Sequence, residues 1–230
     1  MSASKLLLIR HGQASFGAAD YDRLSELGEE QSRRLGAWLR ETGQRPDLVA
    51  VGPLLRHRQT VDACLDAAGI EAHRITLDGL SELDHIDILA RHRPDLDGPE
   101  AWSAELARAD DPRRALQSIF VAAVARWMSG NFDAEYRQDW PSFRNTVLAA
   151  LEQLREHAAR TIWVYTSGGP IAVIANTLLQ ALMEQTFALS WPLVNTSMTR
   201  VVLGRNDSLV SYNAWPHLER AGDEHLVTYR

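Results

Sequence analysis

The chain has 230 residues, a formal net charge of -6 and one cysteine, Cys64. This length is enough for one α/β domain with a large core, and the acidic balance argues against a nucleic-acid-binding protein. A single cysteine excludes an intrachain disulfide and fits a reducing compartment. We expect a cytoplasmic protein, because no apolar run approaches the ~18 residues of a membrane span and the N-terminus leaves no room for a signal peptide.

The first third of the chain alternates apolar runs with amphipathic segments. In chain order, the sequence predicts a strand at 6–9, a helix at 25–42, a strand at 47–51, a helix at 55–68 and a strand at 75–77. Ser25 suits the N-cap of the first helix, and Gly43 and Gly69 suit the ends of the two helices. Cys64 falls on the apolar face of the second helix, so we expect a buried structural thiol rather than a nucleophile.

The segment from about 84 to 142 has a different composition. It is rich in Asp, Arg, Trp and Pro and contains one clear helical pattern, at 112–128. We interpret it as a helical insertion in a single domain that spans 1–230. The expected elements after it are helices at 143–158 and 170–182 and strands at 161–165, 198–203 and 208–213. This order predicts an α/β three-layer sandwich, with a mostly parallel central sheet, helices on both faces and an antiparallel pair at one edge.

Arg10-His11-Gly12 stands directly after the first predicted strand. The carboxyl end of such a strand is where open α/β sheets bind their ligands. A guanidinium can hold a phosphate through two parallel hydrogen bonds, and a neutral imidazole nitrogen can attack phosphorus. Taken alone, the tripeptide fits a surface Arg-His pair equally well, because three residues recur by chance.

Three further segments follow the other predicted strands. Arg56 opens the second helix, Glu82 lies after the third strand, and Ser167-Gly168-Gly169-Pro170 joins an apolar strand to a helix. A helix N-terminus after a glycine turn binds anions, and a carboxyl group can transfer protons. In isolation each segment also fits an ordinary role, as a solvated helix start, a loop acid or a tight turn.

Taken together, these segments resemble the histidine phosphatase superfamily, the phosphoglycerate-mutase-like proteins, over residues 5 to about 218. The segments that carry the resemblance are Arg10-His11-Gly12, Asp22-Arg23-Leu24-Ser25-Glu26-Leu27-Gly28 with Gln31, Pro53-Leu54-Leu55-Arg56 with Gln59-Thr60, Leu80-Ser81-Glu82-Leu83, Asn213 and His217-Leu218. Their order and spacing make the resemblance specific, although each motif is weak alone.

The resemblance implies a role for each matching residue. His11 would take the phosphoryl group on a ring nitrogen, while Arg10 and Arg56 would bind the phosphoryl oxygens. Glu82 would protonate the leaving oxygen and then help to activate the hydrolytic water. The substrate-binding set would be completed by Gly12, Gln13, Ser167 and Gly168. The family uses neither a metal ion nor an organic cofactor, and we expect neither here. The expected binding partner is a small phosphorylated substrate. The protein would be a monomer or a homodimer.

The chain departs from the family pattern at two positions. Ser167 stands where the family usually has a second histidine that donates to the phosphoryl oxygens. A serine hydroxyl is a smaller and neutral donor, and losing a strong donor at developing charge costs about 10²–10³ in rate. His57 and His85 are the candidates to fill the gap. An asparagine that many members carry after the first motif is also absent, with Gln13 and Ser15 as candidate replacements.

Several functions therefore stay open. We favour a phosphatase that Ser167 has slowed or specialised, with an inactive phospho-ligand-binding protein as the main alternative. A mutase is less favoured, because no extra basic cluster is evident to hold a second phosphate. A serine hydrolase using Ser167 is also less favoured, because Tyr165 breaks the Gly-x-Ser-x-Gly pattern.

Overall fold

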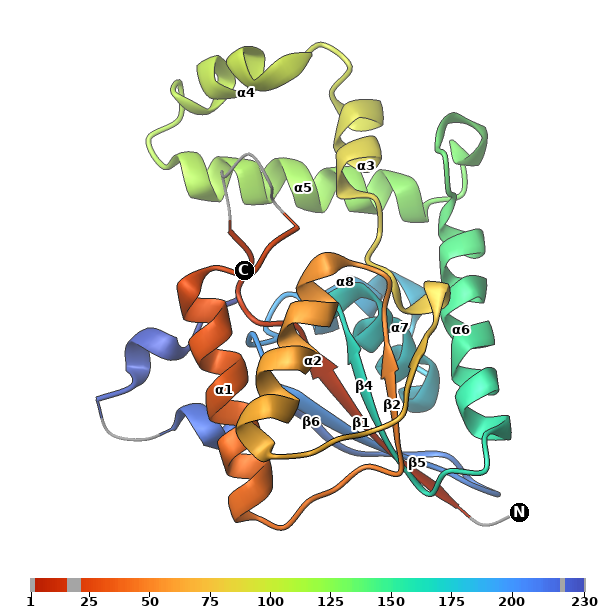
Figure 1. Cartoon of the computed structure of the whole chain (residues 1–230). Helices are drawn as coiled ribbons and strands as arrows, with labels where there is room; N and C mark the ends of the chain where they lie inside the picture. The colour runs from red at the N-terminus through yellow and green to blue at the C-terminus, as the bar shows by residue number, and fades with distance from the viewer. Residues whose placement is uncertain (1–2, 16–21, 220–221, 230) are drawn as a thin grey trace. The chain divides into compact units, whose positions relative to one another are not determined.

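Six strands form one sheet in the order β3-β2-β4-β1-β5-β6 in the computed structural model, which describes residues 3–15, 22–219 and 222–229 (Figure 1). The strands are β1 (Ser4–Arg10), β2 (Leu48–Val51), β3 (Arg74–Thr76), β4 (Thr161–Thr166), β5 (Met198–Leu203) and β6 (Ser208–Ala214). The first four pair in parallel, whereas β5 runs antiparallel to both β1 and β6. The predicted α/β fold is confirmed.

Helices α1 (Glu26–Glu41) and α2 (Leu55–Ala68) lie together on one face of this sheet (Figure 1). Their apolar side chains and alternate strand residues form one core cluster of Leu7, Ile9, Leu35, Leu39, Val49, Val51, Val61, Cys64, Leu65, Trp163, Tyr165 and Met198. The neighbouring strand residues Leu6, Leu8 and Val164 are also buried and point to the opposite face, where α7 (Gly168–Leu179) lies. Burial on both faces explains why β1 and β4 are apolar runs without alternation.

The helices α1 and α2 pack closely because Gly36 has no side chain where they meet. A Cβ atom at Gly36 would lie 2.1 Å from the carbonyl oxygen of Cys64. Cys64 is fully buried, and burial raises the pKa of its thiol to about 12, as expected for a structural rather than a reactive cysteine.

Several elements begin or end a few residues from their predicted positions. The helix α7 begins at Gly168 because Ser167 takes the N-cap position, and it ends at Leu179 because Gln180 adopts a left-handed conformation with φ 52°. The helix α6 (Trp140–Glu156) begins three residues before its predicted start, and β3 lies one residue earlier than expected. The sequence did not predict the short helix α8 (Thr186–Ser190).

The chain divides into two units, one made of Met1–Glu82 with Thr146–Arg230 and the other of Leu83–Asn145. The second unit contains α3 (His85–His92), α4 (Gly98–Leu106), α5 (Pro112–Met128) and the start of α6. The helix predicted at 112–128 is α5, whereas α3 and α4 were not predicted. The helix α4 escaped prediction because it buries none of its residues and so has no apolar stripe. None of the described helices is long and apolar enough to cross a membrane.

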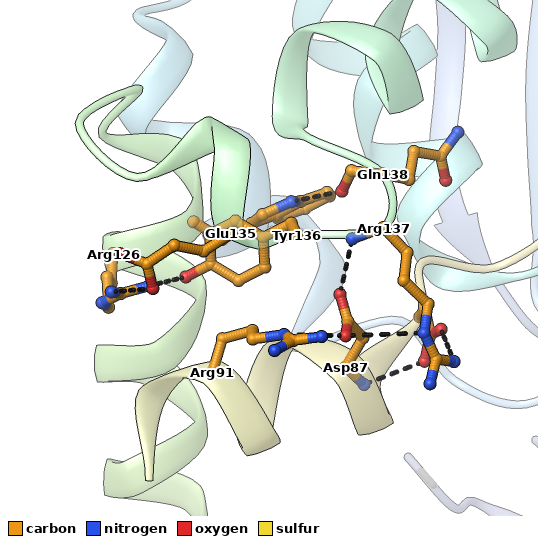
Figure 2. Close-up of polar contacts among 9 residues, drawn as sticks. Asp87, Arg91, Arg126, Glu135, Tyr136, Arg137 and Gln138 are labelled. Carbon is orange, nitrogen blue, oxygen red and sulfur yellow. Dashed lines mark hydrogen bonds and ion pairs between the residues drawn. The ribbon is translucent and has the colours of Figure 1, made fainter. Parts of the chain in front are cut away.

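Asp87 is a buried acid that organises the polar contacts of the second unit (Figure 2). It accepts hydrogen bonds from the backbone N–H of Arg137, at 2.9 Å, and from Arg91 Nε, at 3.1 Å. Arg126 of α5 donates to the hydroxyl oxygen of Tyr136, at 2.7 Å. These contacts tie the segment between α5 and α6 to both α3 and α5.

Replacing Gly36 by Ala should lower the free energy of unfolding by about 1–3 kcal/mol, the usual cost of overpacking a core. At an exposed helix position, the same change would stabilise the protein by roughly 0.5–1 kcal/mol, so the sign of the effect identifies the close contact. Urea unfolding followed by tryptophan fluorescence measures the change. The control is Arg33→Ala on the exposed side of α1, with an effect below about 1 kcal/mol. A Gly36→Ala variant as stable as the wild type would contradict the packing.

Candidate active site

Four chain segments meet at the carboxyl ends of the parallel strands. They carry His11 after β1, Arg56 after β2, Glu82 after β3 and Ser167 after β4. The backbone N–H of His11 donates to the Thr166 carbonyl oxygen at 2.9 Å, and the Thr166 hydroxyl donates to the Leu80 carbonyl oxygen at 2.6 Å. The end of β4 therefore holds the loops of both the candidate nucleophile and the candidate acid.

His11 is buried, with 6% of its surface exposed, and each of its two ring nitrogens lies within hydrogen-bonding distance of another polar group. Its Nδ1 lies 2.7 Å from the Gly12 carbonyl oxygen, and its Nε2 lies 3.2 Å from Arg56 Nε. A carbonyl oxygen only accepts and a guanidinium only donates, so Nδ1 carries the hydrogen and Nε2 the lone pair. Burial, reinforced by the charges of Arg56 and Arg10, lowers the pKa of His11 well below its usual value. The imidazole is therefore neutral at physiological pH.

Arg56 is fixed by an acid that sequence reasoning did not select. One carboxylate oxygen of Asp22 accepts from Arg56 at 2.7 Å, and the other accepts from the backbone N–H of Leu55 at 2.7 Å. Asp22 thus binds both the first residue of α2 and the guanidinium that reaches His11. It belongs to a segment that was quoted for the resemblance, but no periodicity marked it as a partner of Arg56.

Arg10 leaves the sheet at the end of β1 and is held by backbone oxygens. Its guanidinium donates to the carbonyl oxygens of Leu193 and of Tyr229, the latter at 2.9 Å. A Cβ atom at Gly168 would lie 4.0 Å from Arg10 Nε, so the Arg10 side chain passes close to Gly168, the first residue of α7. Arg10 therefore lies between the C-terminal segment and the start of α7.

Glu82 is bound at the N-terminus of α7. Its carboxylate oxygens accept from the backbone N–H of Gly169 at 3.1 and 3.4 Å. Unpaired N–H groups and the positive end of the helix dipole favour an acidic side chain at this place. The carboxyl group is thus held two residues from Ser167.

Ser167 contacts His57 rather than the helix that it precedes. The distance between Ser167 Oγ and His57 Nε2 is 2.7 Å, and the rings of His57 and His11 lie 5.7 Å apart, centroid to centroid. Burial, followed by the charge of Arg56, lowers the pKa of His57 to about 3, so this imidazole is also neutral. Gly52 makes room for it, because a Cβ there would lie 2.3 Å from His57 Nδ1. Of the two histidines suggested by the sequence, His57 contacts Ser167, whereas His85 begins α3 in the second unit.

Gly12 and Gln13 connect the segment after His11 to α2 and to the N-cap of α1. The N–H of Gly12 donates to Thr60 Oγ1 of α2 at 3.0 Å, and the side-chain oxygen of Gln13 accepts from Ser25 Oγ at 2.9 Å. The hydroxyl of Ser15 donates to the Leu24 carbonyl oxygen at 3.1 Å. Replacement of the family's asparagine by Gln13 or Ser15 stays a prediction.

The backbone of His11 is held by Asn195, which the sequence did not suggest, and Asn195 is linked through Thr228 to Gln31. Asn195 Nδ2 donates to the His11 carbonyl oxygen at 3.1 Å, and Asn195 Oδ1 accepts from Thr228 Oγ1 at 2.9 Å. Gln31 of α1 then donates to Thr228 at 2.8 Å and accepts from the Gln13 N–H at 2.9 Å. No local pattern links these residues, because they come from three distant parts of the chain.

No group of three or more His, Cys, Asp or Glu side chains is placed to hold a metal ion in the part of the chain that the structure describes.

A family model described as histidine phosphatase superfamily (branch 1) matches residues 6–214. The chain belongs to the histidine phosphatase superfamily. The family that the sequence resembled is thereby confirmed. The matched residues do not include His217-Leu218 or the C-terminal residues Thr228 and Tyr229.

The chain is similar to mutases in sequence and to phosphatases in fold. A 2,3-bisphosphoglycerate-dependent phosphoglycerate mutase from Corynebacterium kroppenstedtii is 32% identical over 142 residues, which cover 50% of this chain and 57% of the mutase. The chain therefore spans little more than half the length of this curated relative.

Two solved structures match almost the whole chain. The alpha-ribazole phosphatase from Shigella flexneri has a TM-score of 0.60 at 17% identity, over 91% of this chain and 96% of its own. A mycobacterial glucosyl-3-phosphoglycerate phosphatase has a TM-score of 0.58 at 21% identity, over 93% and 100%. Likeness at these identities shows the shared fold alone.

Acid should destabilise the protein, because His11, His57 and His217 are buried in the neutral form. Burial lowers the pKa of His217 to about 3, as it does for His57. Below a pH of about 6.5, the unfolded chain binds protons that the folded chain does not, so the free energy of unfolding rises with pH. This stability is present above about pH 6.5 and is lost as the pH falls toward the folded-state values, by up to about 1.4 kcal/mol per pH unit for each histidine.

The change His217→Asn should reduce this dependence by about one histidine's share, roughly 1 kcal/mol per pH unit between pH 6.5 and 5. Urea unfolding at several pH values gives the slope of the unfolding free energy against pH. Loss of the hydrogen bond between His217 and Thr196 would lower stability equally at every pH and would not change this slope. The matched control is His225→Asn at an exposed histidine. An unchanged slope in His217→Asn would contradict the buried neutral state.

Proposed function

We propose that this histidine phosphatase hydrolyses small phosphomonoesters, without a metal ion, through a phosphohistidine intermediate on His11. The observation that carries the proposal is the orientation of the imidazole, with Nδ1 on the Gly12 carbonyl oxygen and Nε2 directed at Arg56. In this structure the Nε2 lone pair accepts a hydrogen bond from Arg56 Nε, so it faces a guanidinium that stays charged through the reaction. When a phosphate binds, its oxygens can accept that hydrogen bond, and the lone pair is then released to attack phosphorus. A positioned neutral nucleophile next to a cation suits attack on a phosphate dianion.

Two steps then complete the reaction. In the first, His11 Nε2 forms a bond to phosphorus as the ester P–O bond breaks, and protonated Glu82 gives its proton to the leaving oxygen. In the second, the Glu82 carboxylate accepts a proton from a water whose oxygen attacks phosphorus, and the P–N bond breaks. Arg10 and Arg56 bind the phosphoryl oxygens in both steps, and Gly12, Gln13, Ser167 and Gly168 complete the site.

The main alternative is a phospho-ligand-binding protein without turnover. It is supported by Ser167, a position that we interpret, from the family resemblance, as one that usually carries a histidine. A serine hydrolase is a weaker alternative, although Ser167 and His57 form a hydroxyl–imidazole pair. The Gly169 N–H, which an oxyanion hole could use, is bound to Glu82.

Wild-type protein should hydrolyse p-nitrophenyl phosphate in the presence of a chelator, and His11→Ala should be inactive because the nucleophile is gone. Rapid quenching with labelled substrate should trap an acid-labile phosphoenzyme in the wild type only. His225→Ala, at an exposed histidine, is the matched control and should keep full activity. Activity that survives in His11→Ala would reject the mechanism. A wild type that binds phosphate without turnover would favour the alternative.

Glu82→Gln should lower kcat/KM for alkyl phosphates by about 10²–10⁴-fold, the usual contribution of a general acid. The loss should be much smaller for p-nitrophenyl phosphate, because p-nitrophenolate leaves without a proton. Steady-state kinetics with both ester classes measures the difference, and Glu184→Gln at an exposed acid serves as the control. Equal losses for the two classes would show that Glu82 does not protonate the leaving group.

A further inference from the structure

His57 is a buried imidazole to which the mechanism above gives no role. It is fully buried, and its Nε2 lies 2.7 Å from Ser167 Oγ, itself fully buried. Ser167 occupies the N-cap position of α7, where a serine usually accepts a hydrogen bond from the second or third N–H of the helix. Its side chain makes no such bond. The hydroxyl is directed to His57 at the expense of its ordinary helix-capping contact.

The first turn of α2 brings two consecutive side chains to the phosphoryl site. Arg56 contacts His11 Nε2, the proposed point of attachment, and His57 contacts Ser167. Arg10 and Thr166 are the last paired residues of the adjacent parallel strands β1 and β4. His11 and Ser167 each follow directly after one of these strands. The Ser167 hydroxyl is thus held at the same edge of the sheet as the nucleophile.

The direction of the hydrogen bond decides what the serine can do. In the neutral ring only one nitrogen carries hydrogen. His57 Nδ1 lies beside Gly52, whose backbone raises the pKa of His57, but no contact of Nδ1 with the described residues has normal hydrogen-bond geometry. If Nε2 carries the hydrogen, it donates to Ser167 Oγ, and the serine's own hydrogen is left to donate to an anion at His11. The opposite tautomer would direct the serine hydrogen away from the site. Consecutive donors in a dry site also strengthen one another.

We propose that His57 is a positioning residue that donates through Nε2 to Ser167 and so directs the serine hydroxyl hydrogen to the phosphoryl group on His11. The two side chains then act as one neutral donor relay, in which His57 of α2 donates to Ser167 at the end of β4 and Ser167 donates to the substrate. This inference rests on the proposed function, because it assigns the relay to the same phosphoryl site. It predicts that the two residues contribute to the reaction jointly and not separately.

A double-mutant cycle on His57 and Ser167 tests the relay. His57→Ala and Ser167→Ala should each lower kcat for p-nitrophenyl phosphate by about tenfold, the worth of one neutral hydrogen bond. The double variant should also lose only about tenfold, because either change removes the same donor. His57→Gln, which retains an N–H donor, and Ser167→Thr, which retains the hydroxyl, should each recover most of the activity.

A second buried hydrogen-bonded pair, between α2 and β4, provides the matched control. The Tyr165 hydroxyl of β4 donates to Cys64 Sγ of α2 at 3.1 Å, within the apolar core. Tyr165→Phe and Cys64→Ala should alter thermal stability but leave kcat within about twofold of the wild type. If His57→Ala behaves like these variants, or if the losses of the His57 and Ser167 cycle multiply to about 100-fold, the relay is overturned.

Orthovanadate binding, measured by calorimetry, separates failure of the relay from failure of the proposed function. Vanadate occupies the phosphoryl position without turnover, so the same cycle can be measured on its dissociation constant. A wild type that binds vanadate with non-additive losses in the variants, but hydrolyses no ester, would reject the phosphatase and support the relay. Additive losses would reject the relay alone, and absence of vanadate binding would overturn both. Nitrogen-15 NMR of His57 should show hydrogen on Nε2, and hydrogen on Nδ1 would overturn the donor direction.

Discussion

β1 and β4 pair in parallel with Arg10 opposite Thr166, and this register decides which side chains can meet at the end of the sheet. The hydrogen bond from the His11 N–H to the Thr166 carbonyl oxygen continues the pairing by one residue beyond the strands. His11 and Ser167 therefore leave the sheet at the same level. A slip of one residue would turn every side chain of β1 to the opposite face. The apolar packing of Leu6 and Leu7 thus also fixes where the chemistry can occur.

Burial sets the charge of each group at this edge. His11 and His57 lie in a dry environment beside arginines, and both influences favour their neutral forms. Guanidinium groups stay protonated under the same conditions, so positive potential at the site does not depend on pH. Asp22 balances part of that charge and restricts the direction of Arg56. The site therefore combines permanent cations with uncharged imidazoles.

Local signals were enough to predict most of the fold and the segments that form the site. Apolar runs, glycine turns and helix starts mark the ends of β1 and β4 and the start of α2, and parallel strands end at one edge of a sheet. The partners of the site residues were not predictable. Asp22 reaches Arg56 through a loop without periodicity, and Asn195 meets His11 only after the chain has folded back. His57 and Ser167 are 110 residues apart in the chain and meet only in the folded protein.

The strand β1, which leads to the proposed nucleophile, precedes its partners by a long stretch of chain. These partner strands begin at Thr161 and Met198, so a growing chain carries the apolar run of β1 unpaired until those residues have been made. Such segments promote aggregation of incomplete chains and slow folding, because distant parts must come together. The support behind His11 closes later still, when Thr228 reaches Asn195. The contacts that hold His11 are therefore complete only after Asn195 and Thr228 have joined the fold.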